Sequence, residues 1–256
     1  MTAKFDSEIV VIITGASSGI GQQAAKIFTQ RGVTKFCLTS KFDLVETKKL
    51  CLSVNDKVEF VIVKGDITKP ELREQIFNET IQKFERVDIL VNNAGRGIVG
   101  NILDMTMEQY QEIFDVNVTA TVHLSKLCLP YIRKVKGNIV TTSSNAAHKN
   151  MPQLGFYSMS KAALNMFTKA LAQEEGPNGV RVNAVNPGAT NTPFIASVGI
   201  TPEELMQSAK TTHPIGRMAD PEEIAKVLVF IASDDASYMT GSCVLCDGGL
   251  MCYNPI

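Results

Sequence analysis

The sequence predicts an α/β fold: a single doubly wound Rossmann-type domain with a seven-stranded, mainly parallel sheet and helices on both faces. Short runs rich in Val, Ile, Leu and Thr alternate along the chain with segments long enough for helices. Several of these runs are apolar throughout, which is typical of strands buried on both faces of a sheet. Alternating strands and helices imply right-handed crossovers, and these make the strands parallel.

Seven runs predict the strands, and they lie at 9–14, 35–39, 58–63, 87–91, 137–142, 180–185 and 242–246. Six segments predict helices, and they lie at 19–31, 41–52, 70–85, 106–134, 157–174 and 220–233. Capping-box spacing marks three helix starts, in the pairs Thr106 with Gln109, Thr201 with Glu204 and Asp220 with Glu223. No repeat or linker interrupts this order. We therefore expect one domain over residues 1–256, with an insertion around 189–218 past the sixth strand.

The composition excludes several classes of protein. The 256 residues carry 25 Lys and Arg against 26 Asp and Glu, a net charge of −1, which argues against a generally basic nucleic-acid or membrane-surface binder. No stretch approaches the roughly 18 apolar residues of a transmembrane helix, and the start of the chain lacks the pattern of a secretory signal. We expect a cytoplasmic protein without a nucleic-acid or membrane partner.

The six cysteines are Cys37, Cys51, Cys128, Cys243, Cys246 and Cys252. In a long chain without an export signal, buried thiols are expected rather than a disulfide framework. Cys243 and Cys246 form a C-x-x-C pair, but no second pair with metal-ligand spacing accompanies it. The residues around this pair resemble a strand rather than the helix start of a redox motif. We expect no metal site.

The first strand runs into a glycine-rich loop, Thr-Gly-Ala-Ser-Ser-Gly-Ile-Gly at 14–21. Gly15 permits a tight turn, Gly19 lets a pyrophosphate approach the backbone, and Gly21 lets the helix pack close to the sheet. Free N–H groups at the helix start would face phosphates. A plain turn of small residues is the alternative. The candidate dinucleotide-binding residues of this loop are Gly15, Ser17, Ser18, Gly19, Ile20 and Gly21.

This loop resembles that of the short-chain dehydrogenase/reductase family, and the resemblance extends over nearly the whole chain. Tyr157 and Lys161 are four residues apart, so on a helix they share one face. A nearby ammonium lowers the pKa of a phenol, which makes it usable as a general acid or base at neutral pH. Ser144 ends a predicted strand thirteen residues before Tyr157, the spacing that the family shows between its catalytic serine and tyrosine. A serine there could bind a substrate oxygen.

Asn117 lies on the apolar stripe of the predicted helix at 106–134. A buried amide needs partners, so a satisfied core asparagine is one interpretation. The resemblance implies another, in which Asn117 anchors a water linked to Lys161. It also implies that Tyr157 and Lys161 contact the cofactor. Further cofactor-binding candidates by resemblance are Asp66, Ile67, Asn93, Ala94, Gly95, Pro187, Gly188, Thr190 and Thr192.

The end of the second predicted strand bears on the choice of cofactor. An acid there selects NAD through the ribose 2′-OH, whereas a base favours NADP. This chain has Ser40 and Lys41 at that place, which could bind a 2′-phosphate. Against this interpretation, Ser18 replaces a basic residue of many NADP-using relatives, and Asp43 is close. We expect NADP, with NAD as the alternative.

The resemblance implies an NAD(P)-dependent oxidoreductase that transfers a hydride between nicotinamide C4 and a carbonyl or secondary-alcohol carbon, with catalytic residues Asn117, Ser144, Tyr157 and Lys161. Apolar residues in 189–218 suggest a substrate lid and a moderately apolar ketone or alcohol. His148 and His213 flank this region, and we expect both at the surface. The family implies a homo-oligomer, tetramer or dimer. The alternatives are a catalytically silent dinucleotide-binding scaffold of the same fold and an S-adenosylmethionine methyltransferase.

Overall fold

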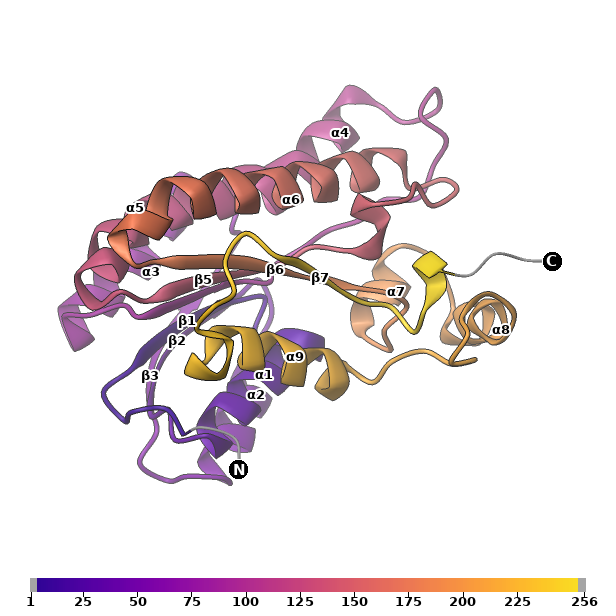
Figure 1. Ribbon diagram of the computed structural model, residues 1–256. Helices are drawn as coiled ribbons and strands as arrows, with labels where there is room; N and C mark the ends of the chain where they lie inside the picture. The colour runs from indigo at the N-terminus through magenta and orange to yellow at the C-terminus, as the bar shows by residue number, and fades with distance from the viewer. Residues whose placement is uncertain (1–3, 253–256) are drawn as a thin grey trace.

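The computed structural model describes residues 4–252, and its core is a seven-stranded sheet (Figure 1). The strands are β1 (Val10–Thr14), β2 (Lys35–Ser40), β3 (Glu59–Lys64), β4 (Ile89–Asn92), β5 (Asn138–Thr142), β6 (Arg181–Pro187) and β7 (Cys243–Cys246). Their order is β3-β2-β1-β4-β5-β6-β7, and every pairing between them is parallel. The predicted fold class is confirmed.

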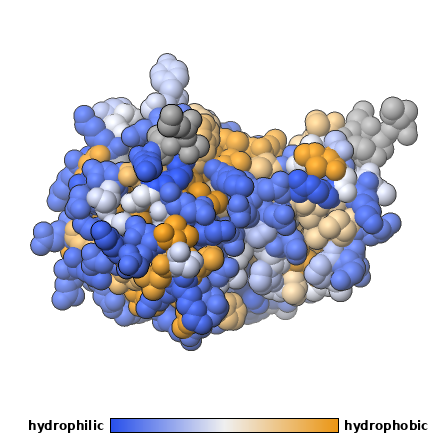
Figure 2. Space-filling view, turned by 90° about the horizontal axis from the view of Figure 1, so that it is seen from below, coloured by the Kyte–Doolittle hydropathy of each residue, from blue (hydrophilic) through white to orange (hydrophobic). Residues whose placement is uncertain are grey.

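Helices cover both faces of the sheet. They are α1 (Gly19–Gln30), α2 (Val45–Leu52), α3 (Pro70–Phe84), α4 (Met107–Phe114), α5 (Ala120–Val135), α6 (Gly155–Glu175), α7 (Pro193–Ser197), α8 (Pro202–Thr212) and α9 (Pro221–Ala232). In Figure 1, α1, α2 and α9 lie below the sheet, while α3, α5 and α6 lie above it. The view from below, on the side of α1, α2 and α9, shows a largely hydrophilic surface with scattered groups of hydrophobic residues (Figure 2). None of the helices within residues 4–252 has the length and apolar character needed to cross a membrane.

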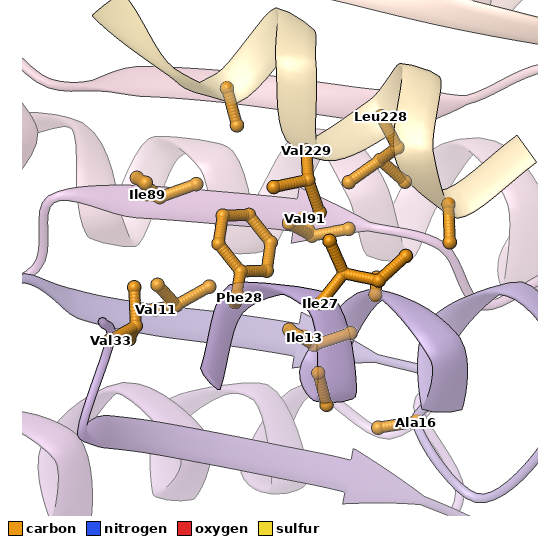
Figure 3. Packing of buried hydrophobic residues seen from close by; sticks show 14 of the residues in the cluster. Val11, Ile13, Ala16, Ile27, Phe28, Val33, Ile89, Val91, Leu228 and Val229 are labelled. Carbon is orange, nitrogen blue, oxygen red and sulfur yellow. The ribbon is translucent and has the colours of Figure 1, made fainter. Parts of the chain in front are cut away.

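Strand β1 shows why the sheet is buried on both faces. Its side chains alternate, so that Val11 and Ile13 pack against Phe28 of α1 and Val229 of α9 (Figure 3). Ile12 points to the opposite face and packs in the cluster beneath α3, α5 and α6. The side chains of these three strand residues and of Phe28 and Val229 are fully buried. This burial explains the unbroken apolar run in the sequence.

Two predicted helices differ from the structure. The segment 106–134 is not one helix, because a π-helical stretch at Asp115–Thr119 separates α4 from α5. Such widened turns occur often at functional sites. The helix expected over 41–52 begins only at Val45, since residues 41–44 form a bend in which the Asp43 carboxylate accepts a hydrogen bond from the Val45 N–H. Side-chain bonds of this kind compete with the helix.

The strand order places a topological switch point between β1 and β4. Chain connections run outward in opposite directions from these two strands, and a crevice therefore opens beyond their carboxyl ends. The glycine loop follows β1, and residues 93–95 follow β4. The functional residues expected from the sequence thus gather at one edge of the sheet.

Candidate active site

The glycine loop has the backbone conformation that its sequence predicts. Gly15 and Gly19 have φ values of +64° and +56°, a region in which other residues are strained. Ser18 caps α1 with an extended backbone but makes no side-chain hydrogen bond to the helix. The first N–H groups of α1 therefore lack a side-chain cap, as a phosphate-binding helix start requires.

Gly21 lies where a side chain would have no room. A Cβ on Gly21 would lie 2.5 Å from the Gly15 carbonyl oxygen and 2.6 Å from Nδ2 of Asn93. The missing side chain lets the first turn of α1 lie against the backbone at the end of β1, and it also leaves room for the Asn93 amide. A Cβ on Gly19 would approach the side chain of Thr192 at 3.0 Å, which brings the loop next to the segment after β6.

Asn93 joins three strand ends. Its Nδ2 donates to the carbonyl oxygens of Thr14 (3.1 Å) and Gly15 (3.2 Å), and its Oδ1 accepts from Thr142 Oγ1 (3.0 Å). The Thr14 hydroxyl in turn accepts hydrogen bonds from the N–H groups of Asn93 and Ala94, both at 2.9 Å. The ends of β1, β4 and β5 are thereby held in one hydrogen-bonded arrangement.

The structure brings Ser144, Tyr157 and Lys161 together. Ser144 follows β5, and the other two lie on α6. The Tyr157 phenol interacts with the Ser144 side chain, and Nζ of Lys161 lies 5.6 Å from the centre of the Tyr157 ring. Nζ also donates to the carbonyl oxygen of Thr142 at 2.8 Å. The three side chains are between 3% and 9% exposed.

Burial dominates the ionisation of this group. It raises the pKa of Tyr157 to about 12, and the interaction with the Ser144 side chain opposes the shift without cancelling it. Burial lowers the pKa of Lys161 to about 7. The expectation that Lys161 lowers the pKa of Tyr157 is therefore wrong for the protein on its own. An amine that is half neutral at pH 7 exerts a weak field on the phenol.

Asn117 sits in the π-helical stretch and is fully buried. Its Oδ1 accepts from the Arg96 N–H (2.8 Å), and its Nδ2 donates to the Arg96 carbonyl (2.9 Å) and to Ser160 Oγ (2.8 Å). Its amide is thus satisfied, as the first interpretation expects. A Cβ on Gly95 would lie 3.5 Å from Nζ of Lys161 and 3.7 Å from Oδ1 of Asn117, so both polar groups border the same small space.

Three supporting residues were not anticipated from the sequence. Ser160 donates to the Tyr157 carbonyl at 2.7 Å while it accepts from Asn117. Asn186, at the end of β6, donates to the Ser144 carbonyl (2.8 Å) and to Oδ1 of Asn165 (3.1 Å). All three are polar side chains at positions where a core residue is expected, which is the one signal that the sequence offers.

The residues expected near the adenosine also lie at this edge. The Ser40 hydroxyl donates to Ser17 Oγ at 2.8 Å. Lys41 is exposed, and its Nζ is 3.9 Å from Oδ2 of Asp66. The other carboxylate oxygen of Asp66 accepts from the N–H and the hydroxyl of Thr68, which lowers the pKa of Asp66. Ile67 packs on the apolar cluster above the sheet.

The segment after β6 closes the other side of the site. A Cβ on Gly188 would lie 2.7 Å from Cα of Asp247, so Pro187 and Gly188 pass close to the end of β7. Thr190 donates to the Gly188 carbonyl at 2.9 Å and pairs with Ala219 in an isolated bridge. The Phe194 ring of α7 lies 5.7 Å from the Tyr157 ring, centre to centre.

Two histidines and two cysteines that the sequence singled out lie outside the group formed by Ser144, Tyr157 and Lys161. His148 is exposed, as expected, and its Nε2 is 3.3 Å from Nδ2 of Asn165. His213 is only 7% exposed, so the expected surface position is wrong. Cys243 faces α6 and donates to the Asn165 carbonyl at 3.8 Å, whereas Cys246 packs with the cluster on the α1 and α9 face. The two thiols therefore point to opposite faces of β7.

Known proteins of similar sequence match the chain over nearly its whole length. A protein-family model described as enoyl-(acyl carrier protein) reductase matches residues 15–251. An uncharacterized oxidoreductase of Thermotoga maritima is 39% identical over 246 residues, which cover 94% of this chain and 96% of that protein. A meso-2,3-butanediol dehydrogenase of Serratia marcescens is 33% identical over 96% of this chain and 95% of its own.

Solved structures match equally fully. A short-chain dehydrogenase/reductase of unknown function from Caenorhabditis elegans, solved with cofactor, has a TM-score of 0.88 and 31% identity, and the match covers 97% of each chain. The L-sorbose reductase of Gluconobacter frateurii, complexed with NADPH and L-sorbose, has a TM-score of 0.89 and 32% identity. That match covers 99% of this chain and 100% of the reductase.

Proposed function

The chain belongs to the short-chain dehydrogenase/reductase family, and on this premise we propose that it reduces a carbonyl to a secondary alcohol with a nicotinamide cofactor, and catalyses the reverse reaction. The observation that carries the proposal is the buried contact between the Tyr157 phenol and Ser144, beside Lys161, at the switch-point edge of the sheet. A polar trio of this kind suits proton transfer to a substrate oxygen.

The chain's own residues account for the proton and for the orientation of the substrate. A bound nicotinamide supplies the hydride that reaches the carbonyl carbon. Tyr157 donates its hydroxyl proton to the carbonyl oxygen, and the Ser144 hydroxyl donates a hydrogen bond to the same oxygen. With a pKa raised to about 12, Tyr157 is protonated at neutral pH and is ready to act as the acid.

Lys161 and Asn117 restore the proton to Tyr157 in this proposal. Their polar groups border the same space beside Gly95, and in the proposal a water links them there. Lys161, with a pKa lowered to about 7, exchanges a proton readily at neutral pH. Its hydrogen bond to the Thr142 carbonyl holds Nζ at the carboxyl end of β5.

The loops at the sheet edge would hold the cofactor. The pyrophosphate fits the uncapped start of α1, with Gly15, Ser17, Ser18, Gly19, Ile20 and Gly21 around it. The adenosine fits between the end of β2 and the segments that contain Asp66, Ile67, Asn93, Ala94 and Gly95. The nicotinamide end fits near Tyr157 and Lys161, with Pro187, Gly188, Thr190 and Thr192 on the other side.

NADP is the proposed cofactor, with NAD as the alternative. The paired hydroxyls of Ser17 and Ser40 and the exposed Lys41 offer donors to a 2′-phosphate, and position 40 carries no carboxylate to repel it. The L-sorbose reductase that resembles this chain was solved with NADPH.

Calorimetry with NADPH, NADH and S-adenosylmethionine tests the cofactor directly. We expect NADPH to bind more tightly than NADH and S-adenosylmethionine not to bind. Lys41→Ala should weaken NADPH binding about tenfold and leave NADH binding unchanged, because it removes one charge contact to the 2′-phosphate. Ser40→Asp should reverse the preference. Equal losses for both cofactors in Lys41→Ala would contradict the assignment.

The substrate side supports a moderately apolar ketone or alcohol. We propose that residues 189–218 form a lid, because Phe194 on α7 packs against the Tyr157 ring and Val198 is buried beside it. Two of the relatives, a meso-2,3-butanediol dehydrogenase and an L-sorbose reductase, are named for small alcohol or ketone substrates. Turnover of a ketone panel, read as loss of NADPH absorbance, tests the activity. Binding of NADPH without any turnover would favour the catalytically silent alternative.

A homo-oligomer, tetramer or dimer, is part of the proposal. Met159 and Met166 are seven residues apart on α6, hence on one face, and are 48% and 64% exposed. Apolar side chains of this size, exposed together on a long helix, suit a helix-packing interface with a second copy. Leu245 on the edge strand β7 is exposed as well.

A further inference from the structure

Gly97, in the loop that follows β4, is a glycine for reasons of space. It is not among the described glycines with positive φ, so its backbone conformation does not require it. It is buried, and a Cβ at this position would lie 2.8 Å from Cγ1 of Val198 and 3.1 Å from Cζ of Phe194. The contact with Val198 is shorter than real Cβ atoms show and the one with Phe194 is tight, so a larger residue at 97 requires the side chains of the lid to shift.

Gly97 also lies next to Tyr157, the proposed proton donor. A Cβ on Gly97 would lie 3.6 Å from Cδ2 of Tyr157, whose ring also packs against Phe194. Tyr157 and Val198 are 9% and 7% exposed. The loop after β4, the end of α7 and the phenol therefore meet in one place, and the lid rests on Gly97 directly beside Tyr157.

The rest of the lid is held by contacts of its own. On its other side, Ile195 packs with Ala209 of α8 and Met218 in a small cluster of their own. The bridge between Thr190 and Ala219 joins the two ends of the segment. Gly199, with φ of +74° and no atom within 4 Å of its would-be Cβ, ends α7 in open space.

We propose that Gly97 and Val198 together set the size of the group that a substrate places beside Tyr157, and that they select carbonyls with one small substituent, such as methyl ketones. This inference rests on the proposed function. Because position 97 has no side chain, the lid can descend until Val198 touches the loop, and the space left beside the phenol is narrow. A bulkier substituent holds the lid open and lowers the rate, since the site stays wet.

Reciprocal size changes at the two positions test the inference. We compare wild type, Val198→Ala, Gly97→Ala and the double variant on acetone, butanone, diethyl ketone and dipropyl ketone. Val198→Ala should raise kcat/KM for dipropyl ketone relative to acetone about tenfold, the effect expected of removing a methyl group or two from a pocket wall. Gly97→Ala should lower kcat/KM for every ketone about tenfold. In the double variant the new Cβ occupies the space of the lost methyl, so activity and profile should return toward wild type.

Val99→Ala is the matched control. It makes the same Val-to-Ala change as Val198→Ala, in the loop that contains Gly97, but at a side chain that is 37% exposed. Its size profile should equal that of wild type. An unchanged profile in Val198→Ala, or a double variant with the multiplied losses of the singles, would overturn the inference while leaving the proposed function intact. Weakened NADPH binding in Gly97→Ala would also overturn it, because Gly97 would then support the cofactor site. If wild type binds NADPH but reduces none of the ketones, the proposed function itself fails and the inference falls with it.

Discussion

The two sides of the site are held by different kinds of contact. On the cofactor side, hydrogen bonds from Asn93 join the ends of β1, β4 and β5, and Lys161 is bound to the last residue of β5. On the substrate side, the five-residue helix α7 rests on Tyr157 and Gly97 through Phe194 and Val198, which are apolar.

This difference indicates which side of the site tolerates amino-acid substitutions. Hydrogen bonds are directional, and a buried donor or acceptor that loses its partner is costly. Apolar contacts tolerate changes of shape as long as the volume is kept. The cofactor side therefore permits few substitutions, whereas the substrate side can accept new side chains and with them new substrates.

Tyr157 lies where the two sides meet, and its hydroxyl should give the largest effect. Tyr157→Phe removes the proton donor and keeps the ring that packs against Phe194. We expect kcat to fall about a thousandfold, with the dissociation constant of NADPH unchanged within about twofold. Stopped-flow turnover and calorimetry measure the two quantities. Activity near the wild-type level would break the comparison, because the phenol would then be only a packing group.

Asn93 tests the polar side. Asn93→Asp keeps the acceptor for Thr142 but turns an oxygen toward the carbonyls of Thr14 and Gly15, which leaves them unsatisfied. We expect the free energy of unfolding to fall by about 3 kcal/mol and NADPH binding to weaken at least about tenfold. Denaturant titration and calorimetry provide the values.

Ile195→Ala is the counterpart on the apolar side, in the cluster that anchors the lid. It should lower the free energy of unfolding by a comparable amount, about 3 kcal/mol, and leave NADPH binding as it is. If both variants weaken NADPH binding equally, the distinction between the two sides is lost.

Lys161 sharpens the comparison through pH. Its pKa falls from 10.5 to about 7 on burial, so between these values the unfolded chain holds a proton that the folded chain does not. Stability then rises with pH in this window and is flat below it. Relative to Lys161→Met, wild type should gain about 2 kcal/mol of unfolding free energy between pH 7 and pH 9. Parallel curves for the two proteins would show that Lys161 is not buried as a neutral amine.

Local pattern predicted most of the fold. The apolar run at 9–14 corresponds to β1, and the spacing of Ser144, Tyr157 and Lys161 indicated residues that the structure brings together. The π-helical stretch around Asn117 interrupts a periodic segment, and periodicity alone does not reveal an inserted residue. Its cause lies in tertiary contacts.

Long-range contacts explain the other differences. The raised pKa of Tyr157 depends on its burial, and a Cβ on Gly21 would meet the Asn93 side chain as well as the Gly15 backbone. The need for glycine at 97 comes from Val198, about a hundred residues later in the chain. None of these relations has a local sequence signal, because each arises only when distant segments meet.

Transfer of deuterium from cofactor to product tests the central claim most directly. The protein is incubated with butanone and NADPH that carries deuterium at nicotinamide C4, and the alcohol is analysed by mass spectrometry and NMR. The account predicts deuterium on the carbinol carbon of the product with wild type, and about a thousandth of that amount in the same time with Tyr157→Phe. Bound NADPH without labelled alcohol, across the whole ketone panel, would contradict it.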